Sequence, residues 1–209
     1  MPKEKLLEIA QKIKDCRRCD LYKGSTHAVP GEGNPQAAVM FIGEAPGFHE
    51  DSQGRPFVGN AGRYLDTLLL KVGLRREDVF ITNVVKHRPP ENRDPTPTEV
   101  AACSVWLEQQ LVTIYPKIVV TLGRWSLARY APKMKISDIH GKPFKAGGVV
   151  VLPMYHPAAA LRSPQTGRWL EEDFLKNKNL LQNPDTADKI TETSKEGQAR
   201  LPDGQGSLF

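Results

Sequence analysis

The chain has 209 residues, of which 39% are hydrophobic, and this suffices for one α/β domain with a core plus a short tail. Its formal net charge of +5 is compatible with a polyanionic partner but is shared by many proteins that have none. The sequence contains no segment that is long and apolar enough to cross a membrane, and its N-terminus lacks the apolar stretch of a signal peptide. We therefore expect a cytoplasmic, monomeric protein.

The N-terminal part of the chain combines a helix with a pair of cysteines. Apolar residues recur at helical spacing over residues 3–14, and Cys16 and Cys19 follow directly. A redox dithiol of the thioredoxin kind would follow a strand and open a helix, whereas this pair follows a helix. The chain has three cysteines, an odd number, which favours metal ligands over disulfides in a reducing compartment.

Strands and helices are predicted to alternate along the rest of the chain. Short apolar runs predict strands at residues 37–42, 79–85, 117–123 and 149–154. Helical spacing predicts helices at residues 60–73, 98–114, 124–131 and 169–181. This order is typical of a three-layer α/β/α sandwich with a central four-stranded parallel sheet. Apolar residues become scarce from residue 182, so we expect a domain at 1–181 and a disordered tail at 182–209.

Polar residues stand just beyond the ends of three predicted strands, namely Glu44, Asn83 and His156. In open α/β sheets, ligands bind outside the carboxyl ends of the strands, so these residues predict a ligand site. Taken singly, Asn83 could cap a turn and His156 could be a loop histidine. Phe57 lies in a glycine-rich loop where backbone can approach a ligand, and it is either a stacking platform or a plug over the core.

Three sequence motifs resemble those of one enzyme family. Gly43-Glu44-Ala45-Pro46-Gly47, then Glu50-Asp51 and the Gly-rich run 54–62, resembles the first motif of the family 4 uracil-DNA glycosylases. Residues 82–86 resemble the middle motif, and the strand followed by His156-Pro157 resembles the second motif of the wider superfamily, with Ala158 where serine is common. The resemblance covers roughly residues 16–181. It implies a DNA-repair glycosylase that flips uracil out of single- or double-stranded DNA and hydrolyses its N-glycosidic bond, leaving an abasic site.

The resemblance also implies roles for individual residues. His156 would stabilise the negative charge that develops at uracil O2, and Glu44 and Glu50 would steady the sugar cation and orient the attacking water. Because Ala45 occupies a position where the best-known uracil-DNA glycosylases carry Asp, the water-orienting group stays open between the two glutamates. The predicted uracil-binding residues are Gly43, Ala45, Gly47, Phe57 and Asn83, and the predicted DNA wedge is Leu161 and Arg162.

A metal cofactor is implied by the same resemblance, with one departure from the usual pattern. Family 4 members typically hold a 4Fe–4S cluster on four cysteines, and His87 stands here at the third position beside Cys16, Cys19 and Cys103. Histidine ligates some iron–sulfur clusters, and a Cys₃His set also suits zinc. We expect a Cys₃His 4Fe–4S cluster, with zinc or no metal as the alternatives.

Three other functions are compared with the sequence. A covalently trapping branch of the superfamily also places histidine at this point, but the segment between Arg88 and Asp94 lacks that branch's insertion and its second histidine. A non-catalytic nucleic-acid-binding protein would keep Phe57 and the basic loop without needing His156. A metal-bearing hydrolase of another substrate is the third alternative.

The last five residues, Gln205-Gly206-Ser207-Leu208-Phe209, end the polar tail with its one pair of large apolar residues. They resemble the short peptides with which bacterial repair proteins bind the replication sliding clamp, although Gly206 replaces the usual Leu. A shortened archaeal clamp motif is the alternative. Leu208 and Phe209 would fill the clamp's apolar pocket, and the tail would act as a tether.

Overall fold

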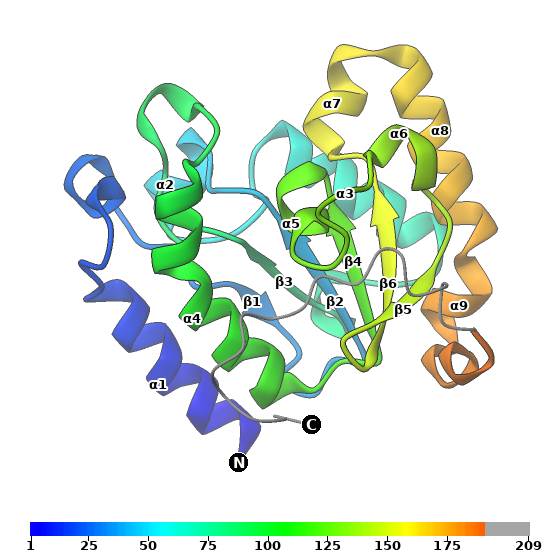
Figure 1. The fold of residues 1–209 in the computed structure, drawn as a ribbon, viewed down its shortest axis with the longest axis horizontal. Coiled ribbons are helices and arrows are strands. Elements are labelled where there is room, and N and C mark those ends of the chain that lie inside the picture. Colours follow the sequence, from blue (N-terminus) through cyan, green and yellow to red (C-terminus); the bar gives the residue numbers. More distant parts are fainter. Residues whose placement is uncertain (191–209) are drawn as a thin grey trace.

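The computed structural model of the chain describes residues 1–190 (Figure 1). These residues form a six-stranded sheet in the order β1-β3-β2-β4-β6-β5. The strands are β1 (Glu32–Gly33), β2 (Val39–Gly43), β3 (Phe80–Asn83), β4 (Ile118–Leu122), β5 (Phe144–Ala146) and β6 (Val149–Met154). The four central strands are parallel, which confirms the predicted α/β class, and β1 and β5 add antiparallel edges that were not predicted.

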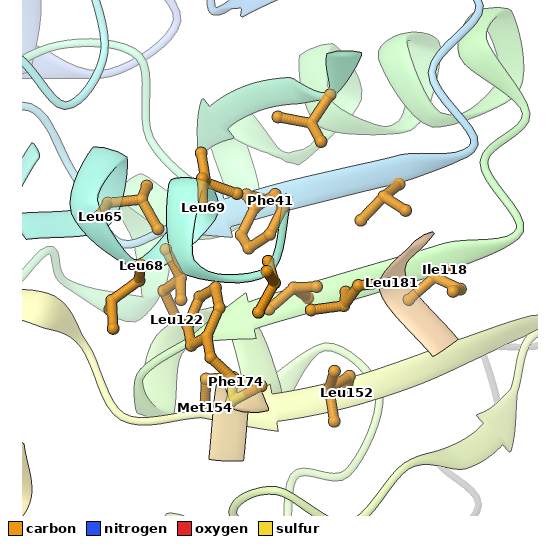
Figure 2. Close-up of a cluster of buried hydrophobic side chains, with 14 of the residues drawn as sticks. Phe41, Leu65, Leu68, Leu69, Ile118, Leu122, Leu152, Met154, Phe174 and Leu181 are labelled. Carbon is orange, nitrogen blue, oxygen red and sulfur yellow. The ribbon is translucent and has the colours of Figure 1, made fainter. Parts of the chain in front are cut away.

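Helices cover both faces of the sheet, as predicted. Alternate side chains of β2 point to opposite faces, so Phe41 packs in one apolar cluster and Met40 in another. The Phe41 cluster lies under α3 (Asn60–Lys71), α8 (Pro164–Lys176) and α9 (Lys178–Gln182), and Figure 2 shows Phe41 beside Leu65, Leu68 and Leu69 of α3. The Met40 cluster lies under α1 (Pro2–Lys14) and α4 (Pro97–Ile114), which run side by side in Figure 1.

Shorter helices fill the connections between these elements. They are α2 (Phe48–Gln53), α5 (Arg124–Ala128), α6 (Ile136–Ile139) and α7 (Pro157–Arg162), with 3-10 helices at Asp20–Gly24, Arg76–Asp78, Pro90–Asn92 and Pro184–Lys189. The start of α4 is fixed by reciprocal capping, in which Thr96 Oγ1 accepts from Glu99 N and a Glu99 carboxylate oxygen accepts from Thr96 N. Among the described residues, no helix has the length and apolar character that spanning a membrane requires.

The sheet register places the ends of the central strands at one edge. Gly43 pairs with Asn83 across β2 and β3, and the pairing continues as Val84 N donates to Gly43 O and Val85 N to Glu44 O. Loops that leave the carboxyl ends of β2, β3, β4 and β6 therefore start side by side, which is where parallel sheets bind ligands.

The predicted closing helix at 169–181 is interrupted in the structure. It is divided between α8 and α9 at Asn177, whose side chain donates to the carbonyl oxygens of Gly141 and Asp173. The folded part also continues beyond residue 181, because Ala187 is buried in the Phe41 cluster. The predicted boundary at 181 falls inside α9 and is too early, since one small apolar residue in a polar segment gives little signal. The predicted clamp-binding peptide at 205–209 lies outside the described residues.

Candidate active site

The end of β3 and the loop that carries Phe57 both approach Gly43, the last residue of β2. A Cβ atom added to Gly43 would lie 2.4 Å from Asn83 Oδ1 and 2.5 Å from Phe57 Cζ. Any side chain at this position would therefore displace both groups, and only glycine lets the amide and the ring approach the strand end. The end of β4 makes a similar approach, because a Cβ on Gly123 would lie 3.3 Å from His156 Cβ. The structure thus brings together Gly43, Phe57, Asn83 and His156.

The side-chain amide of Asn83 is the most unusual group in this pocket. Asn83 is 1% exposed, and neither its Nδ2 nor its Oδ1 has a hydrogen-bond partner among the described residues. Leaving such a polar group buried without a partner costs about 1–3 kcal/mol. An asparagine that caps a turn would have a local partner, so the geometry favours the predicted ligand-binding role over the capping role.

Phe57 packs against the end of β2 and belongs to the core at the same time. Its ring is 5% exposed and packs in the Phe41 cluster, and its centroid lies 5.6 Å from that of the His156 ring with an interplanar angle of 28°. Its backbone φ of 52° lies in the left-handed region, which is uncommon for a bulky residue. This burial matches the interpretation of Phe57 as a plug over the core, and its stacking role stays a prediction.

His156 caps the N-terminus of α7 with its own ring. Its Nδ1 accepts a hydrogen bond of 3.1 Å from Ala158 N, so the neutral ring carries its proton on Nε2. Burial lowers the pKa of His156 to about 4, against an opposing contribution from the charge of Glu50. At neutral pH the imidazole is therefore an uncharged donor through Nε2–H.

Glu44 follows directly on β2 and is half-buried. Burial, together with the nearby carboxylate of Asp94, raises the pKa of Glu44 to about 7. Asp94 itself forms an ion pair with Arg124 of α5. The sequence analysis did not identify Asp94, because it lies in a Pro-rich loop fifty residues from Glu44 and nothing local distinguishes it from other loop acids.

Glu50, the second predicted carboxylate, is engaged by the backbone. Its Oε1 accepts hydrogen bonds of 2.8 Å from both Val58 N and Gly59 N, and its Oε2 accepts one of 3.2 Å from Gly47 N. These bonds join the start of α2 to the loop that contains Phe57. Glu50 thus has a clear structural task, and the amide of Gly47, which was predicted to hold uracil, is already occupied. The side chain of Ala45 packs against the Met40 cluster.

The predicted wedge residues stand at the end of α7. Leu161 is 52% exposed and Arg162 is also exposed. Figure 1 shows α7 beside the carboxyl ends of the strands, next to α8. Leu161 is therefore exposed near this edge of the sheet, and its role as a DNA wedge stays a prediction.

The predicted metal ligands lie in a second region, after α1, after β3 and in α4. Cys16 and His87 line the same cavity of about 220 Å³, and Trp106 Nε1 donates a hydrogen bond of 3.1 Å to Cys16 Sγ. Cys103 is buried, and burial raises the pKa of its thiol to about 11. Within residues 1–190, no three Cys, His, Asp or Glu side chains converge as metal ligands would. The donor types suit a Cys₃His site, but their arrangement is not that of an assembled one.

Comparison with known proteins agrees with the geometry of the pocket. Residues 30–179 match the family model described as the uracil DNA glycosylase superfamily, and the chain belongs to that superfamily. The type-4 uracil-DNA glycosylase of Sulfurisphaera tokodaii is 47% identical over 191 residues, which cover 87% of each chain. That of Thermotoga maritima is 44% identical over 86% of this chain and 96% of its own.

A type-5 uracil-DNA glycosylase from Thermus thermophilus is less similar, at 35% identity over 70% of this chain and 75% of its own. Within the superfamily the chain therefore stands with the type-4 enzymes, as the sequence motifs predicted.

Proposed function

We propose that this protein is a DNA-repair glycosylase that removes uracil from DNA by hydrolysing its N-glycosidic bond and leaves an abasic site. Membership of the superfamily supports the reaction, and the buried, unpartnered amide of Asn83 supports the substrate. That amide lies beside Phe57 at the end of β2, on the edge where parallel sheets bind ligands, and a base would reach it only after leaving the helical stack.

Selection of uracil follows from the donor and acceptor pattern of the Asn83 amide. Its Nδ2 would donate to uracil O4 and its Oδ1 would accept from uracil N3–H. Cytosine presents an amino group and an unprotonated nitrogen at the same two positions, so both contacts would be lost or repulsive. The ring of Phe57 would stack on the flipped base, a contact that contributes about 1–3 kcal/mol.

Cleavage of the glycosidic bond sends its electron pair into the uracil ring, where negative charge develops on O2. The Nε2–H of neutral His156 is the donor that would stabilise this charge, as in an oxyanion hole. The sugar becomes an oxocarbenium-like cation, water adds to its C1′, and the water's proton passes to a base. Glu44, ionised above a pH of about 7, is the carboxylate available for that proton.

The proposal includes a 4Fe–4S cluster on Cys16, Cys19, His87 and Cys103, with zinc or no metal as the alternatives. All three cysteines are free thiols, and two of them follow α1 while the third lies in α4. Such a cluster would cross-link these two helices and the segment after β3, which is a structural contribution. No step of the reaction is assigned to it.

Single- and double-stranded DNA are the proposed partners, and the net charge of +5 favours their approach. The proposed enzyme acts as a cytoplasmic monomer. Residues 205–209 are proposed to bind the sliding clamp, which would concentrate the enzyme near new DNA. A peptide covering residues 198–209 should bind the clamp, and the same peptide with Leu208 and Phe209 changed to Ala should not.

The activity is tested with end-labelled oligonucleotides that contain one uracil, in single-stranded and duplex form, followed by alkali. We expect cleavage at the uracil and none in matched oligonucleotides with thymine or cytosine at that position. His156→Ala protein purified in the same way controls for a contaminating glycosylase. Binding without any cleavage would instead support the non-catalytic nucleic-acid-binding function.

A further inference from the structure

The loop that carries Phe57 is held by an arginine from a distant part of the chain. Arg76 opens the 3-10 helix Arg76–Asp78, and its side chain is 20% exposed. Its Nη1 donates a hydrogen bond of 3.0 Å to Phe57 O, and its Nη2 donates one of 2.6 Å to Pro56 O. One guanidinium therefore binds two consecutive carbonyl groups, which uses the fixed fork of donors that only arginine offers.

Two carboxylates hold Arg76 in this position. Its Nη2 lies 2.7 Å from Glu32 Oε1 and its Nη1 lies 2.9 Å from Asp66 Oδ1. Glu32 belongs to β1 and also accepts two hydrogen bonds from Arg55, at 2.8 and 3.1 Å. Partial burial alone would raise the pKa of Glu32, but the hydrogen bonds from Arg55 and Arg76 outweigh it and the pKa lies below its ordinary value. Glu32 is therefore ionised at neutral pH.

The same loop is held from its other side by Glu50. Val58 N and Gly59 N both donate to Glu50 Oε1, so the carbonyls of residues 56 and 57 and the amides of residues 58 and 59 are all bound by side chains from outside the loop. Helix α3 also packs directly against this backbone, since a Cβ added to Gly62 would lie 1.9 Å from Phe57 O.

These contacts explain how Phe57 keeps its left-handed backbone conformation. A bulky residue at a φ of 52° stays there only when its surroundings determine the conformation more strongly than local preference does. Turning the Phe57 backbone back to an ordinary conformation would break both bonds to Arg76. It would also move the ring away from Gly43 and His156, which it contacts across the pocket.

We propose that Arg76 is a positioning residue for uracil binding, which acts by holding the Pro56 and Phe57 carbonyls and so keeps the Phe57 ring in the pocket. The inference rests on the proposed role of Phe57 as the stacking platform for the flipped base. Arg76 does not touch the base, so its effect must pass through Phe57.

The test is a double-mutant cycle of Phe57→Ala and Arg76→Gln on a uracil-containing oligonucleotide. Because Arg76 acts through the ring, we expect Arg76→Gln to lower kcat/KM about tenfold, mainly through KM, in the presence of Phe57. On the Phe57→Ala background the same change should cost less than about twofold. If Phe57→Ala lowers kcat/KM and the loss in the double variant equals the sum of the two single losses in free energy, the proposed role of Arg76 is wrong. The stacking role of Phe57 would be unaffected by that result. If Phe57→Ala has no effect, the platform role fails and the proposed role of Arg76 falls with it.

Two further variants separate positioning from general stability. Arg75→Gln changes the neighbouring arginine, which is 64% exposed and pairs with Glu77 and Asp78, and it should leave kcat/KM within about twofold. Arg76→Lys keeps the positive charge and one donor nitrogen, so its KM should lie between those of the wild-type and Arg76→Gln proteins. It replaces Arg76→Gln in the cycle if that variant does not fold. All assays are run well below the melting temperature of each variant. A loss for Arg75→Gln equal to that for Arg76→Gln would contradict the proposal.

Discussion

The candidate active site and the candidate metal region are both built from segments far apart in the sequence, yet only the first is assembled. At the active site, β2 and β3 are paired as far as Gly43 and Asn83. The Asn83 amide and the Phe57 ring both pack so closely against Gly43 that a Cβ atom there would clash with them. In the metal region, Cys16 and His87 border an open cavity, and no ligand set converges among residues 1–190. Strand register and the side chains that hold the Phe57 loop shape the active site from the protein itself, whereas metal ligands come together through bonds to the metal.

The two regions also differ in what they leave unsatisfied. At the active site, the buried amide of Asn83 has no partner among the described residues and Phe57 has a positive φ, and both features cost stability. The metal region shows no comparable cost in the described structure, because Cys16 accepts a hydrogen bond from Trp106 and Cys103 packs in an apolar cluster. The predictions below use this difference.

The largest effect is expected at His156. His156→Ala removes the donor to uracil O2 and should lower kcat by about 10²–10³-fold, with little change in DNA affinity. Single-turnover excision and a DNA-binding titration measure the two quantities separately. His140→Ala is the control, because His140 pairs with Asp173 and takes no part in the pocket. Equal turnover by the His156→Ala and wild-type proteins would remove His156 from the mechanism.

Asn83→Leu should separate function from stability. The change deletes both contacts to the base and should lower kcat/KM by about 30–160-fold, at about 1–1.5 kcal/mol for each of the two lost hydrogen bonds. Because the deleted polar atoms have no partner among residues 1–190, the free energy of unfolding should stay the same or increase.

Asn177→Leu is the matched control for that variant. Its side-chain amide is buried and donates to the carbonyl oxygens of Gly141 and Asp173, so its loss leaves two acceptors without this donor. It should destabilise the fold by about 1–3 kcal/mol in urea unfolding while excision is retained. Equal destabilisation by the two leucine variants would mean that Asn83 has a partner that the structure does not show.

The pH dependence of excision should report Glu44. The pKa of Glu44 is raised to about 7, so its carboxyl is protonated below that pH and ionised above it. If the carboxylate accepts the water's proton, kcat/KM rises with pH to a plateau above about 7, and Glu44→Gln abolishes this rise. Asp94→Asn removes a charge that raises this pKa, so the midpoint should move to lower pH. A profile unchanged by Glu44→Gln would assign the titration to another group.

The smallest effect on activity is expected in the metal region. His87→Cys should retain iron and sulfide if His87 is a ligand, while Cys103→Ser should lose them, as measured by metal analysis and visible absorbance of anaerobically purified protein. Since the proposed cluster is structural, loss of metal should lower the melting temperature and leave kcat, measured well below that temperature, nearly unchanged. If the wild-type protein is colourless and contains zinc, the cluster hypothesis is wrong and the zinc alternative is supported.

The sequence predicted the central sheet and much of the pocket for an identifiable reason. Long apolar runs mark buried parallel strands, and Asn83 and His156 stand where such strands end. The edge strands β1 and β5 span two and three residues, which is too short to produce a pattern. The tasks of Glu50 and Arg76 could not be predicted either, because their partners are backbone groups of a loop 8 to 20 residues away.

The central claim is that the buried amide of Asn83 reads uracil, and a crystal structure of the protein with uracil bound tests it most directly. The account predicts the base stacked on Phe57, with O4 and N3 within hydrogen-bond distance of Asn83 Nδ2 and Oδ1 and with O2 facing His156 Nε2. Uracil bound elsewhere, or bound in this pocket while the Asn83 amide stays without a partner, would contradict it.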